Sequence, residues 1–280
     1  MSARMASGAS RGPAAFGDDF RRFANLTLTL ALTDFKLRFF GSVLGYLWTL
    51  MRPLMLFGVI YIVFTEVVKF GADVKYYGVY LLTSIVLFTF FSESTSNGVR
   101  ALVDRENLLR KIRFPRLVIP LSVALAALFN LLANMVVVFA FVFASGITPR
   151  PDWVQLPLLI GVLVVLATGV TMLTSALFVR YRDVEPIWEV ALQILFYASP
   201  VLYVVTLLPD KWESEVTALN PIATVLTQTR HALIDADAPT AVDVLGGWPR
   251  LAIPLAIVAA IFALGLWVFT RETPRIAENL

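Results

Sequence analysis

Six long apolar runs constrain the fold of this chain more than any other feature of its sequence. A helix needs about 20 apolar residues to cross a bilayer core of about 30 Å. Runs of about this length cover residues 43–68, 78–99, 117–145, 153–179, 187–208 and 251–270. With 58% hydrophobic residues, a soluble domain of 280 residues could not bury so much apolar surface. The sequence therefore predicts a polytopic membrane protein with about six transmembrane helices.

The composition of the runs favours helices over strands. Val, Leu, Ala and Phe follow one another without the period of two that a membrane-spanning strand shows. A helix also satisfies its own backbone hydrogen bonds in lipid. The predicted fold class is therefore all-α, with one membrane domain over residues 43–270. The run over 78–99 is the least regular, because its last third, from Ser92, is polar.

The distribution of basic residues predicts the orientation. With the N-terminus inside, 17 of the 23 Lys and Arg residues fall on the inner side, and the other six fall outside. Cytosolic loops are enriched in Lys and Arg. Both termini are therefore predicted to be cytosolic, including a short tail over residues 271–280.

The first 42 residues divide into two parts. Residues 1–17 are small and polar and lack the apolar core of a signal peptide, so we expect a disordered cytosolic tail. Residues 18–42 mix Phe and Leu with Arg and Lys, which is typical of an amphipathic helix in the cytosolic interface. A soluble helix that caps the bundle is the alternative.

Residues 209–249 form the long outer segment before the last run. Asn220 followed by Pro221 predicts a helix start, with an N-cap and a proline in the first turn. The residues after them are too apolar for a free loop. We expect one or two short helices, which either re-enter the outer leaflet or pack on the surface of the bundle.

A cationic stretch over residues 98–116 holds six of the 23 Lys and Arg residues. Its apolar residues recur at three- and four-residue spacings, which predicts a helix with one apolar face. Phe114 and Pro115 end it. One interpretation is an anchor on the lipid headgroups. The embedded Asp104 and Glu106 favour the other, a helix that docks on a partner protein.

The motifs of several enzyme classes are absent from the sequence. It contains no GxxxxGK[ST] phosphate loop, no HExxH and no GxSxG. It has no cysteine and one histidine, His231, which excludes Cys/His metal clusters. We therefore expect no catalytic residue, no metal and no cofactor in this chain.

Several short motifs follow one another around the apolar runs. They are Lys36 to Trp48 with Leu44-Gly45, Arg52-Pro53, Glu106 to Arg116, Ile119-Pro120, Arg180 to Val184, Ser199-Pro200 and Leu219-Asn-Pro221. In the order and spacing of these motifs, the chain resembles the permease subunit of ABC-2-type polysaccharide exporters. That family exports O-antigen, teichoic acid, capsule and galactan chains. Arg52 before Pro53 is less usual in it.

This resemblance implies a homodimer in the bacterial plasma (inner) membrane that carries two copies of a separate ATP-binding subunit. That partner would bind ATP and Mg²⁺, while the permease would move a lipid-linked polysaccharide out of the cytosol; no nucleic acid is involved. A coupling helix would dock on the ATPase through Asp104, Arg105, Glu106, Asn107, Arg110, Lys111 and Arg113. A second, smaller cytosolic contact would consist of Arg180, Arg182, Asp183 and Glu185.

Aromatic residues lie well inside several runs. Sugar rings have apolar faces that stack on aromatic rings, so a glycan channel could be lined by them. The candidates are Trp48, Tyr61, Phe88, Phe91, Tyr197 and Tyr203. The alternative is lipid-facing Phe together with Trp and Tyr at the membrane interfaces.

Two arginines near the start of the first run are candidates for binding the diphosphate of a lipid-linked substrate. These are Arg38 and Arg52, because a guanidinium group matches phosphate oxygens. Arg52 lies about two turns into the run, and snorkelling of its side chain to the headgroups is the alternative.

Two other functions stay open from the sequence. One is an ABC-2 permease for a drug or a small lipid, which the short outer loops also allow. The other is an integral-membrane transferase acting on polyprenyl-phosphate lipids. Such an enzyme needs acidic clusters in cytosolic loops, and only Asp104 with Glu106 and Asp183 with Glu185 offer paired carboxylates.

Overall fold

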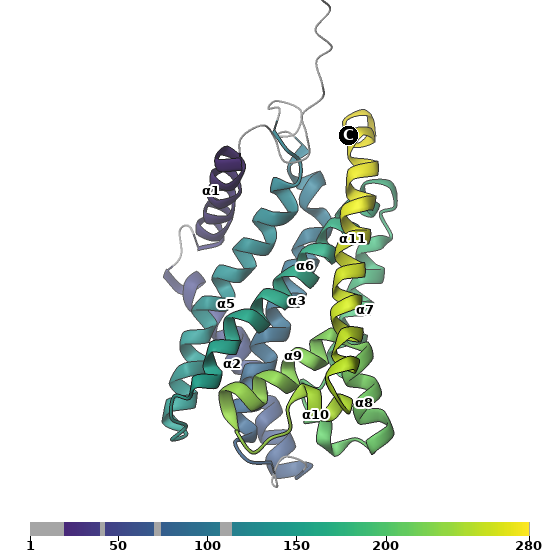
Figure 1. Cartoon of the computed structure of the whole chain (residues 1–280). Coiled ribbons are helices and arrows are strands. Elements are labelled where there is room, and N and C mark those ends of the chain that lie inside the picture. Colours follow the sequence, from purple (N-terminus) through teal and green to yellow (C-terminus); the bar gives the residue numbers. More distant parts are fainter. Residues whose placement is uncertain (1–19, 40–42, 70–73, 107–113, 280) are drawn as a thin grey trace, which may run out of the picture.

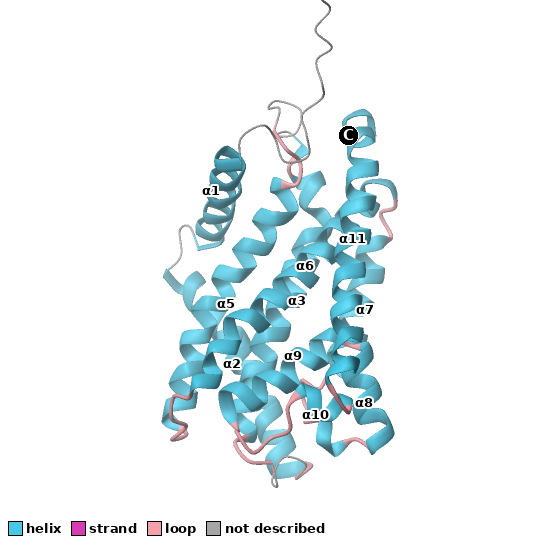
Figure 2. Ribbon diagram, in the orientation of Figure 1, coloured by secondary structure: helices cyan, strands magenta, loops and turns pink. Residues whose placement is uncertain are grey.

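The chain is folded into helices joined by turns and short loops (Figure 1 and Figure 2). The structure is a computed structural model that describes residues 20–39, 43–69, 74–106 and 114–279. In chain order the helices are α1 (Phe20–Phe39), α2 (Val43–Ile62), η1 (Val63–Val67), α3 (Tyr77–Asp104), α5 (Val118–Ala144), η2 (Pro151–Val154), α6 (Gln155–Arg180), α7 (Val184–Ala198), η3 (Val205–Leu207), α8 (Asp210–Leu219), α9 (Pro221–Thr229), η4 (Arg230–Ile234), α10 (Ala241–Leu245) and α11 (Trp248–Asn279). No strand occurs within these ranges. The predicted all-α fold is confirmed.

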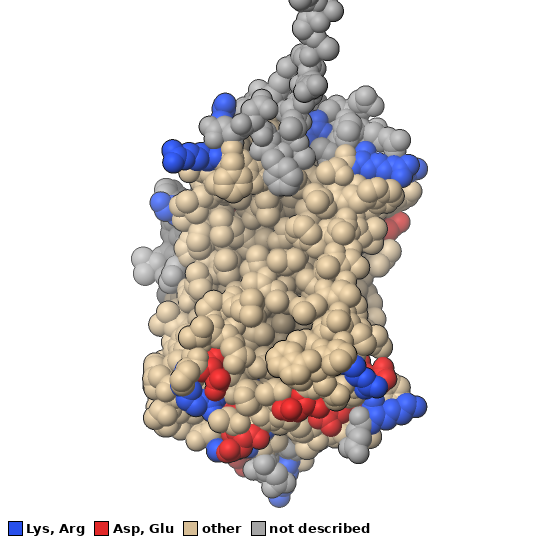
Figure 3. Space-filling model, viewed as in Figure 1, with Lys and Arg blue, Asp and Glu red and all other residues tan. Residues whose placement is uncertain are grey.

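Five helical segments in the described residues are long and apolar enough to cross a membrane. They are Leu47–Val67, Tyr77–Asp104, Val118–Ala144, Pro151–Arg180 and Trp248–Glu272. Figure 3 shows that, on the face in view, charged side chains gather at the two ends and leave an uncharged band between them. Length, composition and this band identify a multi-pass membrane protein.

The fifth predicted span is shorter in the structure than the sequence suggested. α7 begins at Val184 and ends at Ala198, and its 15 residues rise about 22 Å, less than the bilayer core. Ser199 is extended, because a proline disfavours helical backbone in the residue before it. Beyond it, the only helix before residue 209 is the short η3. The prediction of one continuous helix over residues 187–208 is therefore wrong in its second half.

α3 is the centre of the bundle. It packs on α2, α5, α6 and α7, and 78% of its most apolar window is buried inside the protein. Its polar part lies within the bundle, where Ser94 and Thr95 are fully covered and Thr95 Oγ1 donates to the Phe91 carbonyl at 2.9 Å. The helix continues five residues beyond Val99, the predicted end of the run, to Asp104. Ser94 and Thr95 of this span are therefore directed to protein and not to lipid, whereas Ser96 and Asn97 are exposed on the single chain.

α6 and α11 approach each other closely at two glycines. A Cβ atom at Gly265 would lie 2.1 Å from the carbonyl oxygen of Gly169. A Cβ atom at Gly169 would lie 2.7 Å from Cα of Phe262. Small residues let helix backbones approach in membranes. This crossing matters because only 17% of the most apolar window of α11 is buried.

α1 packs along α5, near the end of the bundle that carries the C-terminus (Figure 1). Phe23 is buried in a cluster with Leu117 and Val118, and the ring of Phe35 lies 5.8 Å from that of Phe129. The structure thus has a helix within the range 18–42 expected for an amphipathic helix. Its location in the membrane surface stays a prediction, and the tail over residues 1–17 lies outside the described residues.

The outer segment forms the helices α8, α9 and α10, at the opposite end of the bundle (Figure 1). The predicted start of α9 is confirmed. Asn220 is its N-cap, and its side-chain oxygen accepts hydrogen bonds from the backbone N–H groups of Ile222 at 3.0 Å and Ala223 at 3.4 Å. Asn220 Nδ2 donates to Ser199 Oγ at 2.8 Å, so the cap also ties α9 to the end of α7.

We expect Asn220→Ala to lower the stability of the purified protein by about 1 kcal/mol, because the first turn of α9 loses its cap. A thermal unfolding curve in detergent should show a fall in Tm of about 2–4 °C. Asn220→Asp keeps the acceptor oxygen and should retain most of the stability. An equal fall for both variants would show that the cap is not the source of the effect.

Candidate functional site

One of the two charged ends of the bundle, defined by Asp104 at the end of α3 and by the α6–α7 turn and called the charged end below, carries the first group of predicted functional residues. Asp104 is the last residue of α3, and Arg105 has φ −107° and ψ 21°, which ends the helix. α3 thus includes Asp104, where Ala101 and Leu102 pack in the second core cluster, and the coupling helix over the following residues stays a prediction. Asn107, Arg110, Lys111 and Arg113 lie outside the described residues.

Two ion pairs connect this end of α3 to its neighbours. Arg105 Nη2 pairs with Asp34 of α1. Arg100 Nε lies 2.8 Å from Glu185 Oε2 at the start of α7. All four residues border a groove of about 630 Å³, the charged groove, between α1, α3, α5 and α7. Ion pairs near the surface contribute little to the free energy of unfolding. We therefore interpret these two pairs mainly as contacts that position α1 and α7 relative to α3.

The turn between α6 and α7 carries the second predicted contact. Arg180 and Arg182 are exposed, and the Arg182 guanidinium lies 4.8 Å from the ring centre of Phe178. Asp183 is exposed at the N-cap position of α7 but makes no side-chain cap. Through the Arg100–Glu185 pair, this turn lies directly beside the end of α3. The structure therefore brings the two predicted cytosolic contacts together.

A second cavity, the polar pocket, lies deeper between α2, α3, α5 and α7. It has a volume of about 490 Å³ and is lined by Arg52, Phe88, Glu93, Asn130, Asn134 and Phe196, among others. Asn130 Nδ2 donates to Glu93 Oε1 at 2.7 Å, and Asn134 Nδ2 donates to the Asn130 carbonyl at 2.9 Å. A carboxylate, two carboxamides and a guanidinium group therefore line one cavity of the membrane domain.

Glu93 and Asn130 of this pocket lie at a common depth. Counted from the charged end, Glu93 is eleven residues into α3, or about 17 Å, and Asn130 is twelve residues into α5, or about 18 Å. Both distances are near half the thickness of the bilayer core. Ser96 and Asn97 of α3 line both the polar pocket and the charged groove. The two cavities thus adjoin along one face of α3.

The aromatic candidates are distributed over different parts of the structure. Phe88 lines the polar pocket, with its ring centre 5.2 Å from that of Phe196. Phe91 is buried and lines another cavity together with Trp188. Trp48 is 61% and Tyr197 69% exposed on the surface of the single chain. Only Phe88 of the six candidates borders the polar pocket.

The remaining tyrosine candidates pack against other parts of the protein. Tyr61, 39% exposed, stacks beside Tyr77 with its ring centre 6.5 Å away, and a Cβ atom added at Gly78 would lie 3.0 Å from its ring edge. Tyr203 Oη lies 3.5 Å from the Tyr197 carbonyl. Their role in lining a channel between two chains stays a proposal.

The structure describes the side chain of only one of the two arginines that are candidates for binding a diphosphate. Arg52 is exposed and lines the polar pocket from α2. Arg38 lies in the last turn of α1, and its side chain is outside the described part. Arg52 is thus the candidate that the structure places at a polar cavity.

Sequence reasoning did not single out Asn130 and Asn134, which line the polar pocket. The two asparagines were the available signal, because they are polar residues four positions apart in the otherwise apolar run 117–145. Residues at this spacing share one helix face. They therefore indicated a polar face on this span, although not its partner on α3.

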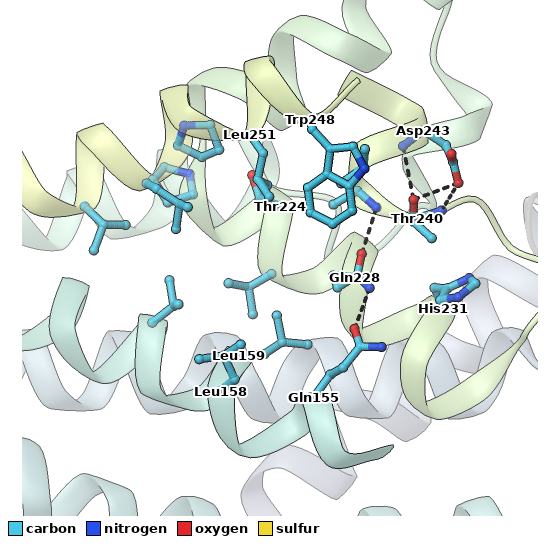
Figure 4. Close-up of a pocket in the computed structure, with 18 residues that line it drawn as sticks. Gln155, Leu158, Leu159, Thr224, Gln228, His231, Thr240, Asp243, Trp248 and Leu251 are labelled. Atoms are coloured by element: carbon cyan, nitrogen blue, oxygen red, sulfur yellow. Dashed lines mark hydrogen bonds between the residues drawn. The ribbon is translucent and has the colours of Figure 1, made fainter. Parts of the chain in front are cut away.

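A third cavity of about 640 Å³ lies at the opposite end of the bundle, between α6, α9 and α11 (Figure 4). Gln228 joins its walls, since its Nε2 donates to Gln155 Oε1 at 2.7 Å and its Oε1 accepts from the Ala241 N–H at 2.9 Å. Hydrogen bonds from Thr240 hold the pKa of Asp243 below its usual range. The side-chain amide of Gln228 thus connects α6, α9 and α10 through these hydrogen bonds.

The described residues contain no group of three or more His, Asp and Glu side chains that could hold a metal ion. The structure is thus a helical membrane protein with polar cavities and a charged end. The chain belongs to the ABC-2 type transporter family, whose profile matches residues 25–234.

Curated relatives match most of the chain. The O-antigen export system permease protein RfbA of Klebsiella pneumoniae is 30% identical over 257 residues, which cover 91% of this chain and 95% of the relative. RfbA of Myxococcus xanthus is 27% identical over 264 residues, with 92% and 96% covered. The polysialic acid transport protein KpsM of Escherichia coli is 23% identical over 214 residues, with 73% and 80% covered. Its relatives are thus transport proteins.

Proposed function

We propose that this chain is the transmembrane subunit of an ATP-driven exporter that moves a lipid-linked polysaccharide from the cytosol across the bacterial plasma membrane. The similarity to O-antigen export permeases over nine tenths of both chains is the observation that carries the proposal. The sequence has no phosphate loop of its own. A separate ATP-binding subunit, with ATP and Mg²⁺, would therefore supply the energy.

The weak burial of α2 supports assembly of two copies around a shared conduit. Only 11% of its most apolar window is buried in the single chain. Trp48, Val59 and Ile62 are each at least 60% exposed on it. Such a face is covered either by lipid or by another helix of matching shape. In the proposed dimer α2 and α7 face the partner copy, and the exposed Trp48 and Tyr197 border the conduit.

The charged end supports contact with the ATPase subunit. The end of α3 and the α6–α7 turn lie side by side through the 2.8 Å Arg100–Glu185 pair, so one partner surface can contact both. Asp104, Arg105 and Glu106 continue into the segment 107–113, which would complete the coupling contact. Displacement of this end by the ATPase would reach the membrane domain directly, because α3 is its central helix.

The proposal is tested by deleting the gene in its native strain. We expect the surface polysaccharide to be lost and its lipid-linked form to accumulate inside, as measured by pulse labelling and by accessibility to an external lectin. Complementation should restore export, and the tagged protein should copurify with an ATP-binding subunit. An unchanged surface polymer, together with altered export of a drug or a small lipid, would contradict the proposal.

A further inference from the structure

Glu93 is the central feature of the polar pocket. A charged residue at the centre of a membrane helix costs about 2.5–3.5 kcal/mol on insertion scales and usually marks a functional site. Here the carboxylate is half-buried and accepts the 2.7 Å hydrogen bond from Asn130. Asn134 extends the polar surface by one helical turn. Three polar groups on two helices are a larger polar surface than an α3–α5 contact in lipid requires.

We propose that the polar pocket is a binding site for one sugar unit of the transported chain, within each permease copy. This inference rests on the proposed function and adds a place of recognition to it. Sugar hydroxyl groups both donate and accept hydrogen bonds. The pocket offers an acceptor carboxylate at Glu93, carboxamides at Asn130 and Asn134, and guanidinium donors at Arg52.

The aromatic wall of the pocket completes this chemistry. Phe88 and Phe196 meet edge to face, with an interplanar angle of 75°. They give the cavity an apolar surface against which the C–H face of a sugar ring can pack, in the same cavity as the polar groups of α3 and α5. The volume of about 490 Å³ falls within the range of about 300–1,000 Å³ of small-molecule sites, room for roughly one or two sugar rings.

The position of the pocket fits a polymer that enters from the charged end. Ser96 and Asn97 line both cavities, so hydroxyl-rich material remains beside polar groups between the charged groove and Glu93. A metal ion is a poorer occupant, because Glu93 is the only carboxylate among the described residues that line the pocket. A lipid chain is also a poorer occupant, because it would place an apolar surface against these polar groups and offer them no hydrogen bond.

Saturation-transfer NMR on the purified permease–ATPase complex in nanodiscs tests the site, with D-glucose, D-galactose, D-mannose and L-rhamnose as probes. We expect transfer to at least one sugar. Asn134→Leu should weaken its apparent affinity about threefold to tenfold, because one hydrogen-bonding group is lost while the Glu93–Asn130 bond remains. Phe196→Leu should weaken it by a similar factor. Glu93→Gln, which keeps the size of the side chain, should also weaken binding.

Matched controls separate the pocket from general effects on the protein. Asn25→Leu changes an exposed side chain of α1. Phe143→Leu changes a side chain of α5 that is 54% exposed. Both should bind the sugar as the native complex does, and size-exclusion profiles should show intact assemblies for all variants. Unchanged transfer in all three pocket variants would overturn the site. Absence of transfer to the native complex, in a strain that still exports its polymer, would also overturn it and leave the proposed function intact.

Discussion

Reversal of charge at Arg105 and Arg110 together, R105E/R110E, is expected to reduce polymer export at least tenfold while the ATPase subunit stays bound and hydrolyses ATP. Both residues belong to the stretch that would dock on the ATPase, and like charges there would weaken the local contact that transmits motion, while the rest of the interface, including the α6–α7 turn, keeps the subunit bound. Arg105 is defined in the structure, where it pairs with Asp34 of α1. Export of pulse-labelled polymer and phosphate release, measured on the same vesicles, give the coupling ratio.

The pair with Asp34 provides a control that charge reversal alone does not. In R105E/D34R the intramolecular pair is formed again with its charges exchanged. If Arg105 contacts the ATPase, this variant remains as uncoupled as R105E. Recovery of export would instead assign Arg105 to the attachment of α1. Normal export by R105E/R110E with its ATPase bound would contradict the coupling role altogether.

Gly265→Val is expected to destabilise the protein by about 3 kcal/mol and to lower its Tm by roughly 10 °C. A Cβ at this position would lie 2.1 Å from the Gly169 carbonyl oxygen, and neither backbone can give way without separating α6 from α11. Since α11 is held mainly by α6, the separation should also reduce the amount of protein recovered from the membrane. Thermal unfolding and yield measure both effects.

Gly161→Val is the matched control, because a Cβ at Gly161 has nothing within 4 Å. Gly161 lies inside α6 and Gly265 lies inside α11, so both variants place valine within a long helix and share its intrinsic helix propensity. We expect a change in Tm of no more than a few degrees for Gly161→Val. A comparable loss for both variants would mean that valine itself, and not the crossing of α6 and α11, causes the effect.

The helices that span the membrane could be predicted because their signal is local. Length and continuity of apolar residues define them, and this holds for five of the six runs. The run 187–208 was wrongly predicted as one helix because hydropathy is averaged over a window that includes Ser199 and Pro200. A proline instead changes the backbone conformation of the single residue before it. The start of α9 was predicted correctly, since an N-cap followed by proline acts within one turn.

The candidate site was less predictable, because its geometry depends on contacts between distant residues. The polar last third of the run 78–99 was recognised as irregular, but Asn130, the hydrogen-bond partner of Glu93 in that segment, lies 37 residues away on another helix. Likewise, Arg100 and Glu185 are 85 residues apart, and only the packing of α3 beside α7 joins them. The aromatic candidates came from composition alone, which does not distinguish Phe88 in a cavity from Tyr197 on the surface.

The Arg100–Glu185 contact has a mechanical consequence. A displacement of the α6–α7 turn and a displacement of the end of α3 would both move α3, because the Arg100–Glu185 pair joins the two parts within the single chain. α3 also carries Glu93, which lies about two turns further into the membrane domain than Arg100. A displacement at the charged end would therefore shift the Glu93 carboxylate relative to Asn130 of α5. This shift would change the affinity of the cavity between them for its ligand.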